Sequence, residues 1–222
     1  MTKEYSSGVA FVFEGETEKV FYHVLMNYFI KKHPGYELLE EQDDNTGEKF
    51  YVLSFQSKRI IIKSNNVGTI SQVTNSGTWF NNRCHKEYES IGWTIFLCYD
   101  TDNYSNDITK FQEGDWKELR KTIEKNRNCK VIDLAAQADI EDIMLLDSDG
   151  VFNFLGLSPV PIPNGKKGKS KMKKIFRMKG IGFAYHEGER ARSLIESLDM
   201  EKIITSSTIP FIEIEKSCFL CP

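Results

Sequence analysis

The sequence lacks several features that would each point to a class of protein. No stretch of its 222 residues approaches 18 consecutive apolar positions, so no membrane-spanning helix is expected. The first residues contain no apolar segment of the kind that a secretory signal peptide needs. The formal net charge is −3, whereas a nucleic-acid-binding protein usually carries a positive excess. With 40% hydrophobic residues the chain can still bury a core, which excludes global disorder.

Cysteine is sparse, and its placement argues against a disulfide framework. The five cysteines are Cys84, Cys98, Cys129, Cys218 and Cys221. An odd number of widely spaced cysteines without a secretion signal indicates reduced thiols in a cytoplasmic protein. Cys218 and Cys221 have the C-x-x-C spacing of half a zinc site. Cys84 and His85 could supply the other two ligands, although buried or idle thiols explain the same pattern.

What the sequence does contain is a regular alternation of strand and helix signals. Apolar runs over 9–13 and 91–99 are typical of strands buried on both faces, and a third strand is expected over 130–134. Helical patterns or signals mark the segments 18–32, 68–89, 116–127, 139–146, 186–198 and 199–204. This order predicts an α/β fold with a mostly parallel sheet flanked by helices.

Other parts of the chain have a different character. Residues 37–49 are acidic and polar and predict a loop, which precedes a β-hairpin that pairs 50–55 with 59–62. Three prolines mark a linker at residues 159–163. A lysine-rich segment, 164–179, follows this linker and is expected to be a basic loop.

Carboxylates follow each of the three predicted parallel strands. They are Glu14 after the first strand, Asp100 and Asp102 after the second, and Asp139, Glu141 and Asp142 shortly after the third. Parallel neighbouring strands have their carboxyl ends at one edge of a sheet, where open α/β sheets bind ligands. We therefore expect the three acidic clusters to converge at that edge.

Such a convergence requires a cation, because neighbouring carboxylates repel one another and would otherwise take up protons. An all-oxygen cluster of this kind suits Mg²⁺ or Mn²⁺. If the segment is extended, Asp100 and Asp102 lie on the same side of it and can reach one ion. Each cluster also has a purely structural interpretation, since Asp caps helices and Glu is common in turns. Asp139 in particular has the position of a helix N-cap.

The acidic motifs occur in a recognisable order. They are Glu14-Gly15-Glu16-Thr17-Glu18, Asp100-Thr101-Asp102 and Asp139-Ile140-Glu141-Asp142. The set resembles the Toprim domain, the Rossmann-like metal-binding module of primases, topoisomerases and several nucleases. The Glu-Gly-x-Thr-Glu form before a long helix is similar to the overcoming-lysogenization-defect (OLD) nucleases and to the RloB-like and AriB-like proteins of bacterial anti-phage systems. The resemblance runs through residues 8–205 and implies a catalytic core over 1–157 that residues 158–222 complete within the same domain.

The resemblance implies roles for individual acids. Glu14, Asp100 and Asp102 would hold a metal ion near the scissile phosphate, and Glu14 could instead move a proton. Glu18 matches a second glutamate of the OLD-like subgroup and lies one helical turn beyond Glu14. Asp139 and Glu141 match the motif associated with a second ion, although the choice among the acids of this motif stays open.

A run of basic residues contrasts with the acidic chain. Its members Lys166, Lys167, Lys169, Lys171, Lys173 and Lys174 are candidates for binding a phosphate backbone. In the OLD-like subgroup a lysine near the cleaved phosphate follows the acidic motifs. Lys169 is the first candidate for this catalytic role, with Lys167 and Lys171 as alternatives. A solvated flexible loop would explain the same run.

Gly168-Lys169-Ser170 is similar to the end of a phosphate-binding P-loop, but the complete motif is absent. Pro163 stands where the motif requires Gly or Ala, and no buried strand precedes it. We therefore expect no ATP site in this chain. The ABC-type ATPase with which OLD-like modules often act would be a separate protein.

The sequence thus predicts a nuclease that uses two Mg²⁺ or Mn²⁺ ions to cleave DNA or RNA, and the resemblance implies a role in anti-phage defence. One alternative is a catalytically silent Toprim-like subunit that works with a separate ATPase. Another is a phosphohydrolase that acts on a small nucleotide. The sequence does not choose between DNA, RNA and tRNA, and it leaves open whether the chain forms a homo-oligomer.

Overall fold

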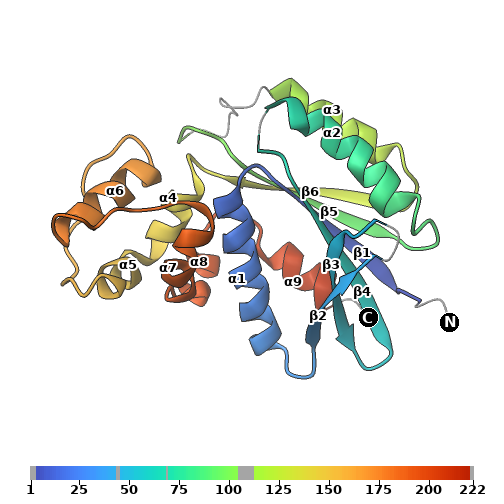
Figure 1. Cartoon of the computed structure of the whole chain (residues 1–222), viewed down its shortest axis with the longest axis horizontal. Helices are drawn as coiled ribbons and strands as arrows, with labels where there is room; N and C mark the ends of the chain where they lie inside the picture. Colours follow the sequence, from blue (N-terminus) through green and yellow to red (C-terminus); the bar gives the residue numbers. More distant parts are fainter. Residues whose placement is uncertain (1–3, 44–45, 69, 105–112, 221–222) are drawn as a thin grey trace.

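Six strands form one sheet at the centre of the molecule. The computed structural model describes residues 4–43, 46–68, 70–104 and 113–220. The strands are β1 (Ser7–Phe13), β2 (Glu37–Gln42), β3 (Lys49–Phe55), β4 (Lys58–Asn66), β5 (Trp93–Asp100) and β6 (Cys129–Ala136), in the order β2-β3-β4-β1-β5-β6 (Figure 1). Strands β4, β1, β5 and β6 are parallel, whereas β2, β3 and β4 pair antiparallel. The predicted α/β fold with a mostly parallel sheet is confirmed.

Helices cover both faces of this sheet because its central strands are apolar on both sides. Phe11 and Phe13 of β1 share one hydrophobic core with α1 (Glu16–Lys32). Ala10 and Val12 point the other way and share a second core with α2 (Ile70–Phe80) and α3 (Glu113–Glu124), which lie together across that face (Figure 1). The odd-even alternation along β1 therefore assigns each side chain to one of two cores.

One strand replaces a predicted loop. β2 lies at the edge of the sheet, and most of its side chains are exposed. Its four charged or amide side chains keep this edge in contact with water, which is how many proteins protect an edge strand, and they hid the strand pattern in the sequence. The hairpin that follows, β3 and β4, is confirmed.

The C-terminal part of the chain is helical. Its helices are α4 (Ile140–Met144), α5 (Ser148–Phe154), α6 (Gly168–Met178), α7 (Arg192–Glu196), α8 (Met200–Ser206) and α9 (Ile212–Cys218). Neither α5 nor α9 is predicted by the sequence pattern, and the segment predicted as one helix over 186–198 is a short 3-10 turn (Gly188–Ala191) followed by α7. Leu194, Ile203 and Ile214 of these helices lie in the same core as α1. None of the helices in the described part of the chain has the length and apolar character needed to cross a membrane.

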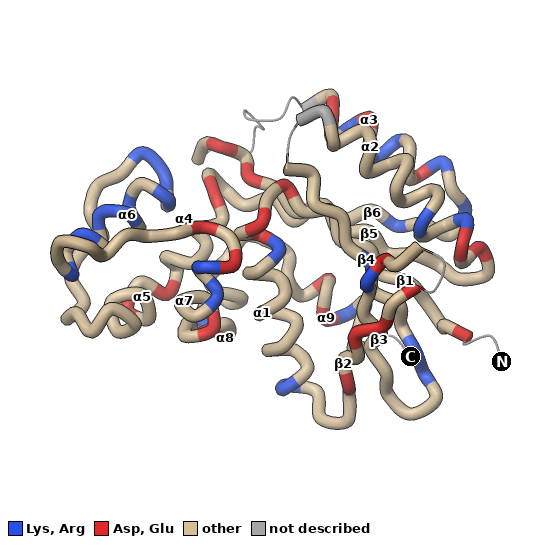
Figure 2. Tube along the Cα trace, viewed as in Figure 1, with Lys and Arg blue, Asp and Glu red and all other residues tan. Residues whose placement is uncertain are grey.

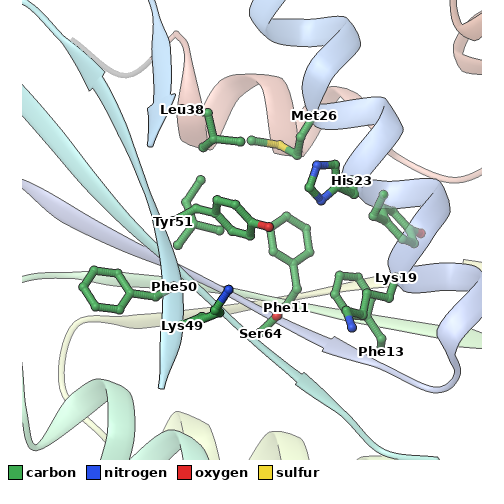
Figure 3. A pocket seen from close by; sticks show the side chains of 12 residues that line it. Phe11, Phe13, Lys19, His23, Met26, Leu38, Lys49, Phe50, Tyr51 and Ser64 are labelled. Atoms are coloured by element: carbon green, nitrogen blue, oxygen red, sulfur yellow. The ribbon is translucent and has the colours of Figure 1, made fainter. Parts of the chain in front are cut away.

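A small aromatic cavity of about 90 Å³ lies between α1 and the sheet (Figure 3). Phe11, Phe13 and Tyr51 form much of its wall, and Lys19 and Lys49 also line it. None of the described residues that line it carries a carboxylate. This cavity therefore lacks the acidic groups on which the predicted chemistry depends.

Candidate active site

The acidic motifs meet at one edge of the sheet. Because β1, β5 and β6 are adjacent and parallel, Glu14, Asp100 and Asp139 leave the sheet at the same edge. A cleft of about 800 Å³ opens there. Its lining includes Glu18, Asp100, Asp102, Asp139, Glu141, Lys167 and Lys169. The strand order thus confirms the expected convergence of the three motifs.

Glu14 stands behind this cleft and is not one of its lining residues. Its side chain is only 2% exposed, and its Oε2 atom accepts a 3.0 Å hydrogen bond from the backbone N–H of Asp100. Glu14 therefore joins the ends of β1 and β5 and fixes the backbone that carries Asp100. Glu18, on the first turn of α1, reaches the cleft itself.

Asp100 occupies an environment that disfavours its negative charge. Burial raises the pKa of this carboxyl well above its usual range, and four neighbouring acids, Glu18, Glu14, Glu141 and Asp139, raise it further. Its Oδ1 atom is buried and has no hydrogen-bond partner among the described residues. Buried polar atoms are nearly always bonded, so this oxygen calls for a partner that those residues do not supply.

Two more acids of the cleft share this environment. Burial, assisted by the charge of Asp139, raises the pKa of Glu141 to about 7. Burial also raises the pKa of Asp139 to about 6. The Tyr185 hydroxyl donates a 2.9 Å hydrogen bond to Glu141 Oε1 and fixes its orientation. A carboxyl group with a pKa near 7 can take up or release a proton at neutral pH.

The lysine-rich segment is not the predicted loop, because most of it forms helix α6. The predicted loop is wrong because Gly168 allows the helix to start against the cleft, where its first N–H groups meet carboxylates. Three of the candidate lysines pair with acids around the cleft. Lys167 bonds Asp102, Lys169 bonds Glu187, and Lys171 Nζ lies 2.6 Å from Asp142 Oδ1. The segment therefore forms one wall of the cleft.

Gly168 makes this close approach possible. Its backbone N–H donates to Asp142 Oδ2 at 2.6 Å, and the next N–H, of Lys169, donates to Asp139 Oδ2 at 3.0 Å. A Cβ atom at position 168 would lie 2.1 Å from the backbone N of Asp142, so no larger residue fits without movement. The first N–H groups of α6 thus bind anions, and these anions are the protein's own carboxylates.

Asp102 departs from the expected geometry. Its φ angle is 64°, in the left-handed region, so Asp100 and Asp102 do not lie on one extended segment and that expectation is wrong. The backbone N–H of Asp102 donates to the carbonyl of Ala138, which is itself left-handed with φ 68°. A turn built from two strained residues locks the end of β5 against the start of α4 and aims Asp102 at Lys167.

The donor set of the cleft fits a hard divalent cation in its chemistry. Apart from Lys167, Lys169 and Arg190 the charged residues that line it are carboxylates, and the buried Oδ1 of Asp100 has a free position for a ligand. As the side chains stand, no three His, Cys, Asp or Glu residues in the described part of the chain form a finished metal site. Asp102 instead forms an ion pair with the ammonium group of Lys167.

The remaining candidate lysines do not pair with acids in the described part of the chain. These three lysines, Lys166, Lys173 and Lys174, are exposed. Lys174 Nζ donates to the backbone carbonyl of Asn164 at 2.6 Å. The run that looked uniform in the sequence is therefore divided between the cleft and the solvent.

The cysteines do not form the zinc site that their sequence allowed. Cys84 is buried in the core that α2 and α3 cover, whereas Cys218 is buried in the core on the opposite face of the sheet. The sheet separates the two thiols, so Cys84 and Cys218 cannot share one ion. Cys221 lies outside the described residues.

Comparisons with known proteins gave weak structural similarity. No protein-family model and no curated protein matches the chain. A 5′-methylthioadenosine/S-adenosylhomocysteine nucleosidase from Borrelia burgdorferi B31 bound to adenine is 12% identical with a TM-score of 0.25, and the match covers 60% of this chain and 66%, just under two thirds, of that one. A futalosine hydrolase mutant of Helicobacter pylori strain 26695 is 11% identical with a TM-score of 0.25, and the match covers 92% of this chain and 100% of that one. Similarity at this level carries no argument about function.

Proposed function

We propose that this protein is a metal-dependent nuclease that hydrolyses phosphodiester bonds of DNA or RNA with Mg²⁺ or Mn²⁺ in the acidic cleft. The observation that carries the proposal is Asp100, a buried acid among other acids, whose Oδ1 atom has no hydrogen-bond partner in the described part of the chain. A cation would supply that partner and would offset the repulsion between the carboxylates. The ordered acidic motifs, which resemble the Toprim domain, support the same function.

Most of the acids would hold cations, whereas Glu14 would position Asp100 and Glu141 would also exchange a proton. Glu18, Asp100, Asp139 and Glu141 line the cleft and would hold the ions, with Asp102 joining them once Lys167 releases it. Bound ions would supply Lewis acidity at the scissile phosphate. Glu14 would keep Asp100 in place through its backbone, and Glu141 would take up or release a proton near neutral pH.

The lysines of the cleft wall would bind the substrate. Lys167 pairs with Asp102, so a cation that bound Asp102 would free its ammonium group for a phosphate. Lys169 and Lys171 pair with Glu187 and Asp142 and would exchange these carboxylates for a phosphate of the substrate. Lys169 remains our candidate for the lysine nearest the cleaved bond. The setting in anti-phage defence, and a separate ABC-type ATPase as partner, are parts of this proposal that come from the resemblance.

A second candidate function is a catalytically silent subunit that acts with a partner. The ion pairs of Lys167 with Asp102 and of Lys171 with Asp142 favour it, because they could serve only to hold α6 against the sheet. The two functions differ in what Mg²⁺ should do. A nuclease gains activity from the ion, whereas a silent subunit does not.

The test is a cleavage assay on plasmid DNA, single-stranded DNA and tRNA with Mg²⁺, Mn²⁺ or EDTA. The nuclease proposal predicts cleavage that EDTA abolishes and that Asp100→Asn lowers by about a thousandfold. Asp133→Asn is the matched control, since Asp133 lies on the next strand but pairs with Arg120 outside the cleft. Equal cleavage by the wild type and Asp100→Asn would refute the site, and no cleavage of any substrate would favour the silent subunit.

A further inference from the structure

One continuous segment of the chain contains basic residues and no acidic residue. Residues 150–186 contain eight of the 29 Lys and Arg residues and none of the 32 Asp and Glu residues. This segment includes α6 and the loop after it, and it protrudes at the end of the molecule nearest the cleft, where Figure 2 shows basic positions gathered along α6. We call residues 164–183 the basic lobe.

Within the described part of the chain, the basic residues along α6 are paired with acids at one end of the helix and unpaired at the other. Near its N-terminus, Lys167, Lys169 and Lys171 pair with acids around the cleft. Further along, Lys173 and Arg177 are exposed and have no acidic partner among the described residues. With 11 residues α6 is about 16 Å long, so a track of uncompensated positive charge leads from the cleft to a tip beyond the helix.

The loop after α6 exposes apolar side chains, although binding to phosphates by charge alone would not need them. Met178, Ile181 and Phe183 are 48%, 107% and 49% exposed, so Ile181 projects fully into solvent. Gly180 and Gly182, with φ angles of 133° and 98°, turn the chain sharply on either side of it in conformations that a side chain would oppose. The loop therefore presents an apolar point on a positive surface.

We propose that residues 178–183 form a wedge that contacts unstacked bases of the nucleic acid whose backbone follows α6, so that the substrate class is a duplex interrupted by unpaired nucleotides. Positive charge on the track complements the phosphates, and apolar side chains between basic residues are the kind of group that stacks on or inserts between bases. The wedge lies about 16 Å from the cleft, or roughly five base steps at 3.4 Å each. This inference rests on the proposed function, because the cleft is taken as the place of cleavage.

The test measures binding without cleavage, so that its outcome is independent of the nuclease proposal. Fluorescence anisotropy in EDTA would compare a duplex with a central unpaired bubble, the fully paired duplex and one strand alone. The double variant Ile181→Ser/Phe183→Ser removes the wedge. The control is Leu39→Ser, which removes an apolar side chain of similar exposure, 49%, from β2 outside the basic lobe.

The wedge predicts that the double variant binds the bubble about 5- to 100-fold more weakly, with the paired duplex changed less than threefold and Leu39→Ser unchanged on both. A 2-aminopurine placed in the bubble should change fluorescence with the wild type and not with the double variant. Equal losses on bubble and paired duplex, or no loss, would overturn the proposal. So would binding of the wild type to phosphatidylserine vesicles, lost in the double variant, without any preference for the bubble.

A failure of the proposed function gives a different pattern. If the protein cleaves nothing but the double variant loses its preference for the bubble, the wedge stands and the nuclease does not. If cleavage depends on Asp100 but the double variant cuts and binds the bubble as the wild type does, the nuclease stands and the wedge does not.

Discussion

The acidic cleft and the basic lobe carry opposite charges within one α/β chain, and they hold those charges in opposite ways. In the cleft, carboxylates such as Asp100 and Glu141 are buried, and burial raises their pKa values. In the lobe, cations such as Lys173 and Arg177 stand in water. The two regions meet at the first turn of α6, where backbone N–H groups bond Asp139 and Asp142.

This difference shows what each region can do. Buried charge is costly, so the cleft acids take up protons, pair with lysines or bind a cation, and their state depends on pH and on metal. Exposed charge costs little and acts over about 10 Å before salt screens it, so the lobe attracts polyanions without needing a fixed geometry. We therefore expect the reaction to take place in the acidic cleft and the basic lobe to capture the substrate.

The largest expected effect separates the two regions directly. Asp100→Asn removes the buried charge of the cleft, so cleavage should fall about a thousandfold while binding of DNA in EDTA changes less than threefold. The same change should raise the thermal stability of the metal-free protein at pH 8, because it removes a buried negative charge that the neighbouring acids repel. Differential scanning calorimetry checks the second result, and a lowered melting temperature there would contradict the proposed strain.

Gly168 lies where the acidic cleft meets the basic lobe, and its replacement should lower both the stability of the protein and its cleavage activity. Gly168→Ala places a Cβ against the backbone of Asp142, and we expect the free energy of unfolding to fall by about 1–3 kcal/mol, with cleavage lowered as α6 moves from the cleft. Gly114→Ala in α3 is the control, because a Cβ there meets nothing within 4 Å, and it should be neutral or stabilise the helix by up to about 1 kcal/mol. Equal stability of the two variants in urea unfolding would rule out a close approach at residue 168.

The pH dependence of stability should reveal the buried acids. Asp139 and Glu141, with pKa values of about 6 and about 7 in the folded protein, bind protons more tightly there than in the unfolded chain. Their contribution is fully present below about pH 4 and is lost as the pH rises through about 7, a change on the order of 3 kcal/mol for each acid. Urea unfolding of the metal-free protein between pH 4 and 8 measures this loss.

Glu141→Gln serves as the comparison for that titration, because it should remove much of the decline between pH 5 and 8. Mg²⁺ should stabilise the wild type more at pH 8 than at pH 5, where protons compete for the same oxygens. A stability difference between wild type and Glu141→Gln that stays constant over this range would refute the raised pKa.

The smallest expected effect concerns the lobe alone. We replace Lys173, Lys174 and Arg177 by Gln and plot the logarithm of the DNA-binding constant against the logarithm of the salt concentration. The magnitude of the negative slope should decrease by about 2 to 3, and the stabilisation of the protein by Mg²⁺ should not change. Anisotropy titrations at several salt concentrations measure the slope. A change in the Mg²⁺ effect, or an unchanged slope, would show that the two regions are not divided as proposed.

Much of this arrangement could be predicted from the sequence, because it depends on local patterns. Apolar runs predicted β1, β5 and β6, and the acids that follow them predicted Glu18, Asp100 and Glu141 at one edge. The hairpin of β3 and β4 was also predicted. Each of these features depends on residues that are close in the chain.

Features that involve distant segments were missed. Tyr185 gave no signal, because its bond to Glu141 joins residues 44 positions apart. The role of Gly168 likewise depends on the backbone of Asp142. The sequence predicts a loop in place of β2 because an edge strand with charged side chains has no apolar alternation.

The sequence by itself determined which residues carry charge and which strands are buried, since composition and periodicity are properties of the chain alone. Only the tertiary structure decided how that charge is held. It placed Glu14 behind the cleft, turned Asp102 toward Lys167, and divided one lysine run between the acids and the solvent. The physical reason is burial, because the pKa of an acid and the availability of a lysine depend on neighbours that only folding brings together.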